Sequence, residues 1–367
     1  MTQDDIIEML LAFIAADEER CDTKSAASED AFDDVALRLF TYQFENNRPF
    51  RRFCIQRGRT PRTARSWRDI PAVPINAFKE LTLSCCAPED AARVFMTSGT
   101  TLGGVRGKSY HPTLAVYDAS MIRGFKQYFM PDRDRVDMSI LFPGEDVMPN
   151  SSLAHYLALA LSQFGADGSR NAMQGDGIAF DHLFELLDRA QIAGTPYALL
   201  GASYSYVPLL DEMKRRGLSF ILPPGSRLFD TGGFKGQSRE LGLDDFYDRL
   251  AAGFGVPREK CINMYGMTEL STQFYDRGNA VCPSVKSGPH WIRSRVINPL
   301  TGDDVPVGET GVLVHCDLAH FNIVSTILTE DAGVETENGF LLLGRADGAE
   351  AKGCSMAVEE FLKAAQA

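Results

Sequence analysis

The stretch MTSGTTLGGVRGKSYHP, Met96–Pro112, is rich in glycine, serine and threonine and carries two cations, Arg106 and Lys108. The residues that lead into it, ARVFMT (92–97), have the composition of a β-strand. A strand that leads into such a loop is a common phosphate cradle, because glycines let backbone N–H groups approach an anion while hydroxyls donate hydrogen bonds. The loop is not a Walker A motif, since G-x-x-x-x-G-K-[ST] is missing. Taken alone, the stretch fits either a phosphate site or a mobile surface loop.

The rest of the chain predicts the sheet that would carry this loop. Residues 1 to about 50 have the apolar spacing of helices, and downstream of the loop helix-like and strand-like segments alternate. The helix-like segments are 112–129, 151–164, 178–191, 205–217 and 238–254, and the strand-like segments are 136–143, 196–203, 226–233 and 261–266. This alternation implies an α/β fold with a mostly parallel sheet covered by helices. From about Ser284 short β runs predict a small β-rich subdomain.

The charge of the chain excludes several classes of partner. A formal net charge of −12 argues against general affinity for nucleic acid or anionic membranes. One segment opposes this trend, because RRFCIQRGRTPRTARSWR, Arg51–Arg68, holds seven arginines and no acid. It fits a solvated basic face or a surface that docks an acidic partner or a phosphate-bearing ligand. No apolar run reaches the roughly 18 residues of a membrane span, so no membrane partner is expected.

The cysteines indicate a reducing environment. Eight cysteines occur without a C-x-x-C pair, and no secretory signal is visible at the N-terminus. We therefore expect free thiols and a cytoplasmic location. The usual structural zinc signatures are absent. A metal site made of Cys282, His290, His315 and Cys316 is an alternative whose spacing is unlike that of a compact site.

A second segment supports the phosphate interpretation of the glycine loop. NMYGMTEL, Asn263–Leu270, follows a strand-like run, and the order of M-T-S-G-T-T and then Y-G-M-T-E resembles the adenylate-forming superfamily of acyl-CoA synthetases, luciferases and peptide-synthetase adenylation domains. Further landmarks of that superfamily are matched in order by TGGFKG (231–236), GETGVL (308–313), LTEDAG (328–333) and LGRADG (343–348). The resemblance implies that the chain joins a carboxylate to AMP and releases pyrophosphate.

The resemblance also implies ATP and Mg²⁺ as cofactors and gives roles to single residues. Cations and hydrogen-bond donors must offset the charge when a carboxylate attacks the α-phosphate. Glu269 would hold Mg²⁺, which prefers oxygen ligands, and Thr268 would contact the α-phosphate. Asp331 would accept the ribose hydroxyls, and Arg345 would fix the ribose. Glu269 also fits an ordinary surface acid, and Arg345 a plain salt-bridge partner. The β- and γ-phosphates would be held by Thr97, Ser98, Gly99, Thr100 and Thr101. The adenine would be lined by Asp230, Thr231, Gly232, Gly233, Met264, Tyr265 and Gly266.

The end of the chain departs from most of the superfamily. Most relatives continue past the hinge motif with a domain that brings in a catalytic lysine, whereas this chain ends soon after LGRADG. We expect one large domain, residues 1–343, followed by a hinge and a short helical tail, residues 344–367, in place of a full C-terminal domain. Without that lysine, Lys235 and Lys108 are the candidate cations for adenylation.

Cys354 is the chemically interesting residue of this tail. We expect Gly353 to be a loose joint and a helix to begin at Ser355, so that Cys354 lies at a helix N-terminus. The helix dipole and the nearby Lys352 would then lower the pKa of the thiol. The chain would carry its own acyl acceptor, and the alternative is a buried small residue that caps the tail helix.

Three stretches resemble one branch of the superfamily, the LuxE-type acyl-protein synthetases. They are IPAVPINAFKEL (70–81), TGGFKG (231–236) and LLLGRADGAEAKGCSMAVEE (341–360). The branch implies activation of a fatty acid with ATP, transfer of the acyl group to a cysteine, and delivery to a partner reductase of the LuxC kind. The alternatives are a compact acyl- or aryl-CoA ligase with a structural Cys354, and a non-catalytic scaffold that keeps the nucleotide fold. The acyl pocket would be formed by His155, Tyr156, Ser203 and Tyr204, although His155 equally fits a packed helix residue.

Overall fold

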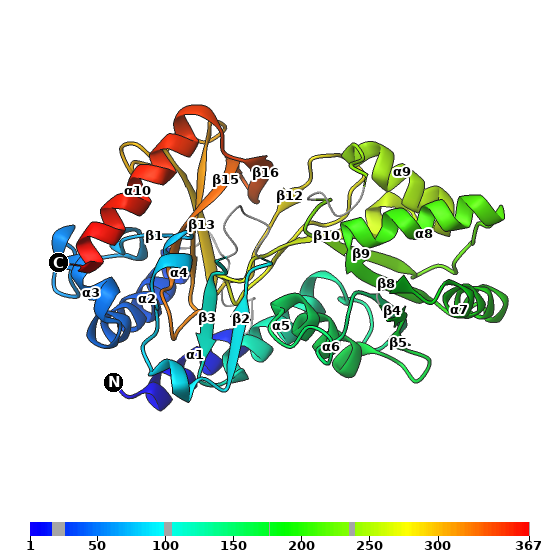
Figure 1. Ribbon diagram of the computed structural model, residues 1–367, viewed down its shortest axis with the longest axis horizontal. Helices are drawn as coiled ribbons and strands as arrows, with labels where there is room; N and C mark the ends of the chain where they lie inside the picture. The colour runs from blue at the N-terminus through cyan, green and yellow to red at the C-terminus, as the bar shows by residue number, and fades with distance from the viewer. Residues whose placement is uncertain (17–25, 99–104, 176, 235–238, 367) are drawn as a thin grey trace. The chain divides into compact units, whose positions relative to one another are not determined.

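The computed structural model describes residues 1–16, 26–98, 105–175, 177–234 and 239–366 (Figure 1). The chain divides into two compact units. Unit 1 comprises Met1–Arg123, Met267–Thr272 and Gly288–Ala367, and unit 2 comprises Gly124–Gly266 and Gln273–Ser287. Within the described ranges, no helix combines the length and the hydropathy that crossing a membrane requires.

Unit 2 is built on a six-stranded sheet in the order β11-β10-β9-β8-β4-β5. Its strands are β4 (Asp137–Leu141), β5 (Arg170–Asn171), β8 (Tyr197–Ala202), β9 (Arg227–Thr231), β10 (Cys261–Tyr265) and β11 (Phe274–Tyr275). Neighbouring strands are parallel except for β10 and β11. The predicted α/β alternation and the mostly parallel sheet are therefore confirmed. The sequence did not predict the short pieces β6 (Met173–Gln174), β7 (Gly177–Ile178), β12 (Val285–Lys286) and the 3-10 turn η4 (Arg258–Lys260).

Helices cover both faces of the unit 2 sheet. On one face lie α7 (Phe180–Ala193), α8 (Ser203–Arg216) and α9 (Leu243–Phe254), whose leucines share a core with Leu199 and Leu228 of the sheet (Figure 1). On the other face, Phe229 contacts Phe125 of α5 (Ala115–Tyr128) and Tyr156 of α6 (Ser152–Phe164). Ser151 caps the N-terminus of α6, since its side chain accepts from the N–H of Ala154.

Unit 1 contains the predicted β-rich part. Its strands β13 (Ile292–Ile297), β14 (Thr310–Asp317), β15 (Thr326–Thr336) and β16 (Gly339–Arg345) are antiparallel in the order β16-β15-β14-β13. A two-residue strand, β1 (Val73–Pro74), pairs with β15 in parallel. The glycine loop joins β2 (Arg93–Met96) to β3 (Lys108–His111), and these two strands form an antiparallel hairpin. The end of the quoted loop is thus a strand with buried side chains, which the sequence did not predict.

Helices α1 (Gln3–Ala15), α2 (Ala26–Asn46) and α3 (Arg48–Gln56) confirm the predicted helical character for the described residues among the first 50. Short elements follow: η2 (Trp67–Asp69), α4 (Ala77–Glu80) and η3 (Pro88–Asp90). Two arginines of the basic segment pair with acids of unit 1 itself, since Arg59 pairs with Asp69 and Arg68 with Asp304.

The last helix corrects the expectation for the tail. Helix α10 runs over Gly348–Gln366, so it begins before Gly353 rather than at Ser355. It packs on α3, β1 and β15 within unit 1. The ring of Phe361 lies edge-on to the ring of Phe53 of α3, with 4.8 Å between the ring centroids. The residues described between 344 and 366 therefore belong to unit 1, and a separate C-terminal segment stays a prediction.

Candidate active site

The base of the glycine loop is fixed by two hydrogen bonds between Thr97 and Gly107. The Thr97 N–H donates to the Gly107 carbonyl at 3.0 Å, and the Gly107 N–H donates to the Thr97 hydroxyl at 3.0 Å. Ser98 is exposed next to this base. Gly99, Thr100 and Thr101 lie outside the described residues, so their phosphate contacts stay predictions.

The Y-G-M-T-E segment lies against this base. The Ser109 hydroxyl of β3 donates to the carbonyl of Thr268 at 2.8 Å. A Cβ placed on Gly107 would stand 3.3 Å from the Thr97 side chain and 3.4 Å from a carboxylate oxygen of Glu269. The structure therefore brings together Thr97, Thr268 and Glu269, which come from two motifs far apart in the sequence.

Glu269 is a buried acid, with 6% of its surface exposed, and is not the surface acid of the alternative. Burial raises the pKa of its carboxyl to about 7, while the charges of Lys79 and Arg345 oppose the rise and that of Asp331 adds to it. A cation beside the carboxylate would relieve the cost of burying its charge. A carboxylate whose buried charge is only partly balanced by nearby cations is a suitable oxygen ligand for Mg²⁺.

The predicted ribose pair is adjacent on neighbouring strands. Asp331 of β15 and Arg345 of β16 are register partners, and the Arg345 Nε lies 3.5 Å from the Asp331 Oδ1. Arg345 also contacts Glu330 at 3.2 Å. The salt-bridge alternative for Arg345 is thus observed, and its ribose role stays a prediction.

Other residues of this region were missed by the sequence analysis. Asp317 of β14 accepts from the N–H groups of Ser271 and Thr272 at 2.7 and 2.8 Å and from the Thr272 hydroxyl at 2.6 Å. It thereby anchors the chain directly after Glu269. An acid about fifty residues from the motif it supports gives no signal in a single sequence.

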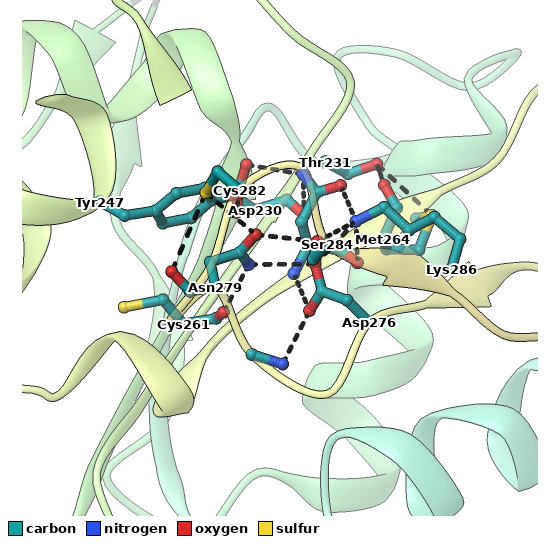
Figure 2. Close-up of polar contacts among 12 residues, drawn as sticks. Asp230, Thr231, Tyr247, Cys261, Met264, Asp276, Asn279, Cys282, Ser284 and Lys286 are labelled. Atoms are coloured by element: carbon teal, nitrogen blue, oxygen red, sulfur yellow. Dashed lines mark hydrogen bonds and ion pairs between the residues drawn. The ribbon is translucent and has the colours of Figure 1, made fainter. Parts of the chain in front are cut away.

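In unit 2 the predicted adenine residues lie at the ends of β9 and β10 (Figure 2). Asp230 is 2% exposed and accepts from Ser203 Oγ at 2.7 Å, Asn263 Nδ2 at 2.8 Å and Tyr247 OH at 3.0 Å. The Thr231 hydroxyl donates to the Met264 carbonyl at 2.9 Å. Tyr265 is buried, and Gly232 and Gly266 are exposed. Asp230 is therefore a structural centre of this unit, and its contact with adenine stays a prediction.

A buried ion pair adjoins this carboxylate and was also missed. Lys286 Nζ lies 2.7 Å from Asp276 Oδ2 and donates to Asn263 Oδ1 at 2.6 Å (Figure 2). Asp276 further accepts from Ser284 Oγ at 2.7 Å and from Asn279 Nδ2 at 3.0 Å. These groups fix the two strand ends that carry Thr231 and Met264.

The four residues predicted for the acyl pocket all lie on α6 and α8. His155 Nδ1 shares a 2.9 Å hydrogen bond with Glu145, and Tyr156 OH shares one of 2.9 Å with Tyr275. Ser203 bonds to Asp230, and Tyr204 is half-buried. Since these contacts join side chains of one unit, they show packing, and the pocket stays a prediction.

Cys354 does not have the environment that the sequence predicted. It is 3% exposed, packs among Ile297, Val314 and Leu328, and places its Sγ 3.7 Å from the Thr329 carbonyl. Burial and the nearby charge of Glu330 raise the pKa of the thiol to about 11. The predicted lowering of this pKa is wrong, because α10 begins before Cys354 and the sulfur is buried.

The two neighbouring expectations for the tail have different outcomes. Gly353 lies inside α10, where a Cβ would approach Pro299 to 2.9 Å, so close packing rather than a joint explains the glycine. Lys235 lies outside the described residues. Lys108 is an exposed residue of β3, and its role stays a prediction.

The alternative metal site is not formed. The described part of the chain holds no group of three or more His, Cys, Asp or Glu side chains suited to a metal ion, so Cys282, His290, His315 and Cys316 do not make one. The His315 ring instead bonds to Ser294 at 2.8 Å, and burial lowers its pKa to about 3. The seven described cysteines are free thiols.

The fold is that of the adenylate-forming ligases. A crystal structure of 2-hydroxyisobutyryl-CoA ligase in complex with 2-HIB-AMP matches with a TM-score of 0.67 and 16% identity, over 90% of this chain and 70% of that one. Within this class the family is defined more narrowly. The chain belongs to the LuxE acyl-protein synthetase family, whose model matches residues 16–363.

Two curated relatives carry the name long-chain-fatty-acid–luciferin-component ligase. The one from Vibrio harveyi is 23% identical over 301 residues, which are 81% of this chain and 77% of the relative. The one from Aliivibrio fischeri is 22% identical over 307 residues, which are 83% of this chain and 79% of the relative. Both comparisons confirm the resemblance derived from the motifs.

Proposed function

We propose that this protein activates a carboxylic acid with ATP as an acyl-adenylate and then transfers the acyl group to its own Cys354. The observation that carries the proposal is the match of nearly the whole chain, residues 16–363, to the LuxE family. A fatty acid is the favoured substrate, because the two curated relatives are named for long-chain fatty acids.

The first step brings two anions together, and unit 1 carries residues suited to offset their charge. An oxygen of the carboxylate bonds to the α-phosphorus of ATP, and pyrophosphate leaves. Cations and hydrogen-bond donors must offset the charge of the two anions. Glu269 would hold Mg²⁺, which when bound supplies positive charge beside the phosphates. Asp331 would accept from the ribose hydroxyls, with Arg345 beside it.

The second step requires α10 to expose its sulfur. The Cys354 thiol loses its proton, its sulfur bonds to the acyl carbon, and AMP leaves. Because Cys354 is 3% exposed and the pKa of its thiol is about 11, the docked form of α10 is unreactive. Opening of α10 is therefore part of the proposal.

One observation favours a second function. The burial of Cys354 in an apolar cluster is what a structural cysteine would show, and such a cysteine belongs to the alternative of an acyl- or aryl-CoA ligase. In that case coenzyme A would accept the acyl group.

Labelled fatty acid with ATP and Mg²⁺ separates the two functions. The proposal expects a hydroxylamine-labile label on the protein that Cys354→Ser abolishes and Cys316→Ser keeps, because Cys316 is a buried thiol of the same unit without the proposed role. Product that appears only with coenzyme A would replace the proposal by the second function. Chelation of Mg²⁺ with EDTA should stop pyrophosphate release in both cases.

Two finer statements extend the proposal. We propose that the acyl-enzyme delivers its acyl group to a partner reductase, since a thioester is a suitable substrate for reduction to an aldehyde. We place the protein in the cytoplasm, and the free thiols support this because a reducing compartment keeps them so.

A further inference from the structure

Helix α4 is a short element that borders three parts of the candidate site in unit 1. Phe78 lies beside the base of the glycine loop, since a Cβ on Gly107 would stand 3.4 Å from the Phe78 Cβ and 3.4 Å from a Glu269 oxygen. The next residue is Lys79, which is half-buried. The loop base and the proposed Mg²⁺ ligand therefore both adjoin the element that carries this lysine.

A continuous set of polar contacts leads from Lys79 to the predicted ribose pair. Lys79 Nζ donates to Asn76 Oδ1 at 2.9 Å, and the Asn76 amide contacts the carboxylate of Glu330. Glu330 in turn pairs with Arg345 at 3.2 Å, and Arg345 lies 3.5 Å from Asp331. The position of the ammonium group is thus set by the same network that fixes Arg345.

The charge of Lys79 lies at the site as well. Lys79 belongs to the same four-residue helix as Phe78, and its ammonium group is one hydrogen bond from Asn76, which contacts Glu330. Glu330 and Asp331 both contact Arg345. An ammonium group on a flexible stem can follow charge that moves during a reaction.

We propose that Lys79 is a catalytic residue, whose ammonium group offsets the negative charge that develops on the phosphates as the carboxylate attacks the α-phosphorus. This inference rests on the proposed function. One bond forms, from the carboxylate oxygen to the α-phosphorus. One bond breaks, from the α-phosphorus to the oxygen that bridges it to the β-phosphorus, and pyrophosphate leaves with the electron pair. Lys79 keeps its proton throughout.

The experiment measures pyrophosphate release and ATP binding in the same variants. Lys79→Met keeps the aliphatic stem, and we expect kcat to fall at least about 100-fold. The Kd of ATP, measured by calorimetry, should change by less than about threefold, because a group that acts mainly in the transition state contributes little to ground-state binding. Lys79→Arg should restore part of kcat, since it keeps the charge but changes its geometry.

Two further variants make the outcome specific. Lys260→Met removes the charge of an exposed lysine of η4 that has no proposed role, and we expect it to keep most of kcat. Asn76→Ala releases Lys79 without removing its charge and should reduce kcat by a smaller factor than Lys79→Met. Thermal unfolding of each variant shows whether it is folded, and Lys79→Arg is the variant to compare if Lys79→Met unfolds.

The results that overturn the inference are distinct from those that overturn the proposed function. If Lys79→Met is folded and keeps kcat within about threefold, or loses ATP binding in proportion to kcat, Lys79 is not the catalytic cation. If Lys79→Arg is no better than a folded Lys79→Met, the charge is not what matters. If the unaltered protein releases no pyrophosphate with any acid, the proposed function fails and the role of Lys79 with it.

Discussion

Asp230 is the buried carboxyl whose protonation should be visible in the stability of the protein. Burial raises its pKa from 3.8 to about 6, although hydrogen bonds from Ser203 and Asn263 oppose the rise. A carboxyl with a raised pKa in the folded state contributes stability below pH 4, and that contribution is lost as the pH rises through about 6. Asp230→Asn lacks this titration.

We therefore expect the free energy of unfolding of Asp230→Asn, relative to that of the unaltered protein, to increase when the pH is raised from 5 to 7.5. The gain should be on the order of 1 kcal/mol, on top of a constant loss from weaker hydrogen bonds. Urea unfolding at both pH values measures it. Asp188→Asn, at an exposed position of α7, is the control for exchanging an aspartate for an asparagine. A stability difference that is equal at both pH values would contradict the assignment.

At the scale of single residues, the sequence motifs predicted the site residues that belong to the motifs. They did not predict the side chains elsewhere in the chain that fix the motif segments by hydrogen bonds and ion pairs. Glu269 and the pair of Asp331 and Arg345 were predicted, because their segments carry short signatures. Asp317 was not, and neither was the pair of Asp276 and Lys286. These side chains act through contacts whose sequence separation is set by the fold, so one sequence contains no local sign of them.

Cys354 lies on the side of α10 that packs against Ile297, Val314 and Leu328, so the proposed reaction requires α10 to open. The C-terminal part of α10 is held on α3 by three contacts. The rings of Phe361 and Phe53 lie with their centroids 4.8 Å apart, and Arg57 Nη2 lies 2.6 Å from Glu360 Oε2. Arg52 donates a hydrogen bond to the Ala365 carbonyl. Phe361→Ala should remove about 3–5 kcal/mol of packing energy. Local opening of α10 would then be more frequent, and we expect iodoacetamide to label Cys354 at least about tenfold faster.

Mass spectrometry of the labelled peptide measures this rate. Phe246→Ala, which truncates a buried side chain of α9 in unit 2, lowers stability without touching α10 and should leave the rate nearly unchanged. An unaltered rate in a destabilised Phe361→Ala would mean that α10 opens only when the whole protein unfolds.

At the scale of elements, the sequence predicted most of the unit 2 strands and helices but not the start of α10. Gly353 suggested a break, since glycine costs about 1 kcal/mol relative to alanine inside a helix. The structure shows why Gly353 is tolerated there, because a larger residue would collide with Pro299. Packing against the sheet therefore outweighs the low helix propensity of glycine. Because the helix begins before Cys354 and buries it, the pKa of the thiol is raised rather than lowered as predicted.

At the scale of the whole molecule, the two units differ in how far a sequence can predict them. Unit 2 consists mainly of one continuous segment, Gly124–Gly266, whose alternation of helix and strand is a local signal. Unit 1 is assembled from three separate segments. Hydrophobic periodicity cannot show that the residues after Tyr265 join a hairpin near residue 100, and only the order of family motifs indicated it.

The division into residues 1–343 and a tail leads to the last prediction. A chain that ends at Arg345 would lack α10 and would expose Phe53 and the apolar side chains of Ile297 and Leu328. Exposed apolar surface lowers stability by about 25 cal/mol per Å². We therefore expect this shortened chain to melt several degrees lower than the full chain and to bind a hydrophobic dye. Calorimetry of both chains tests this, with Cys354→Ala in the full chain as the control for loss of the thiol alone. An unchanged melting temperature would mean that residues 1–343 are stable by themselves and that α10 is only loosely attached, as a separate tail would be.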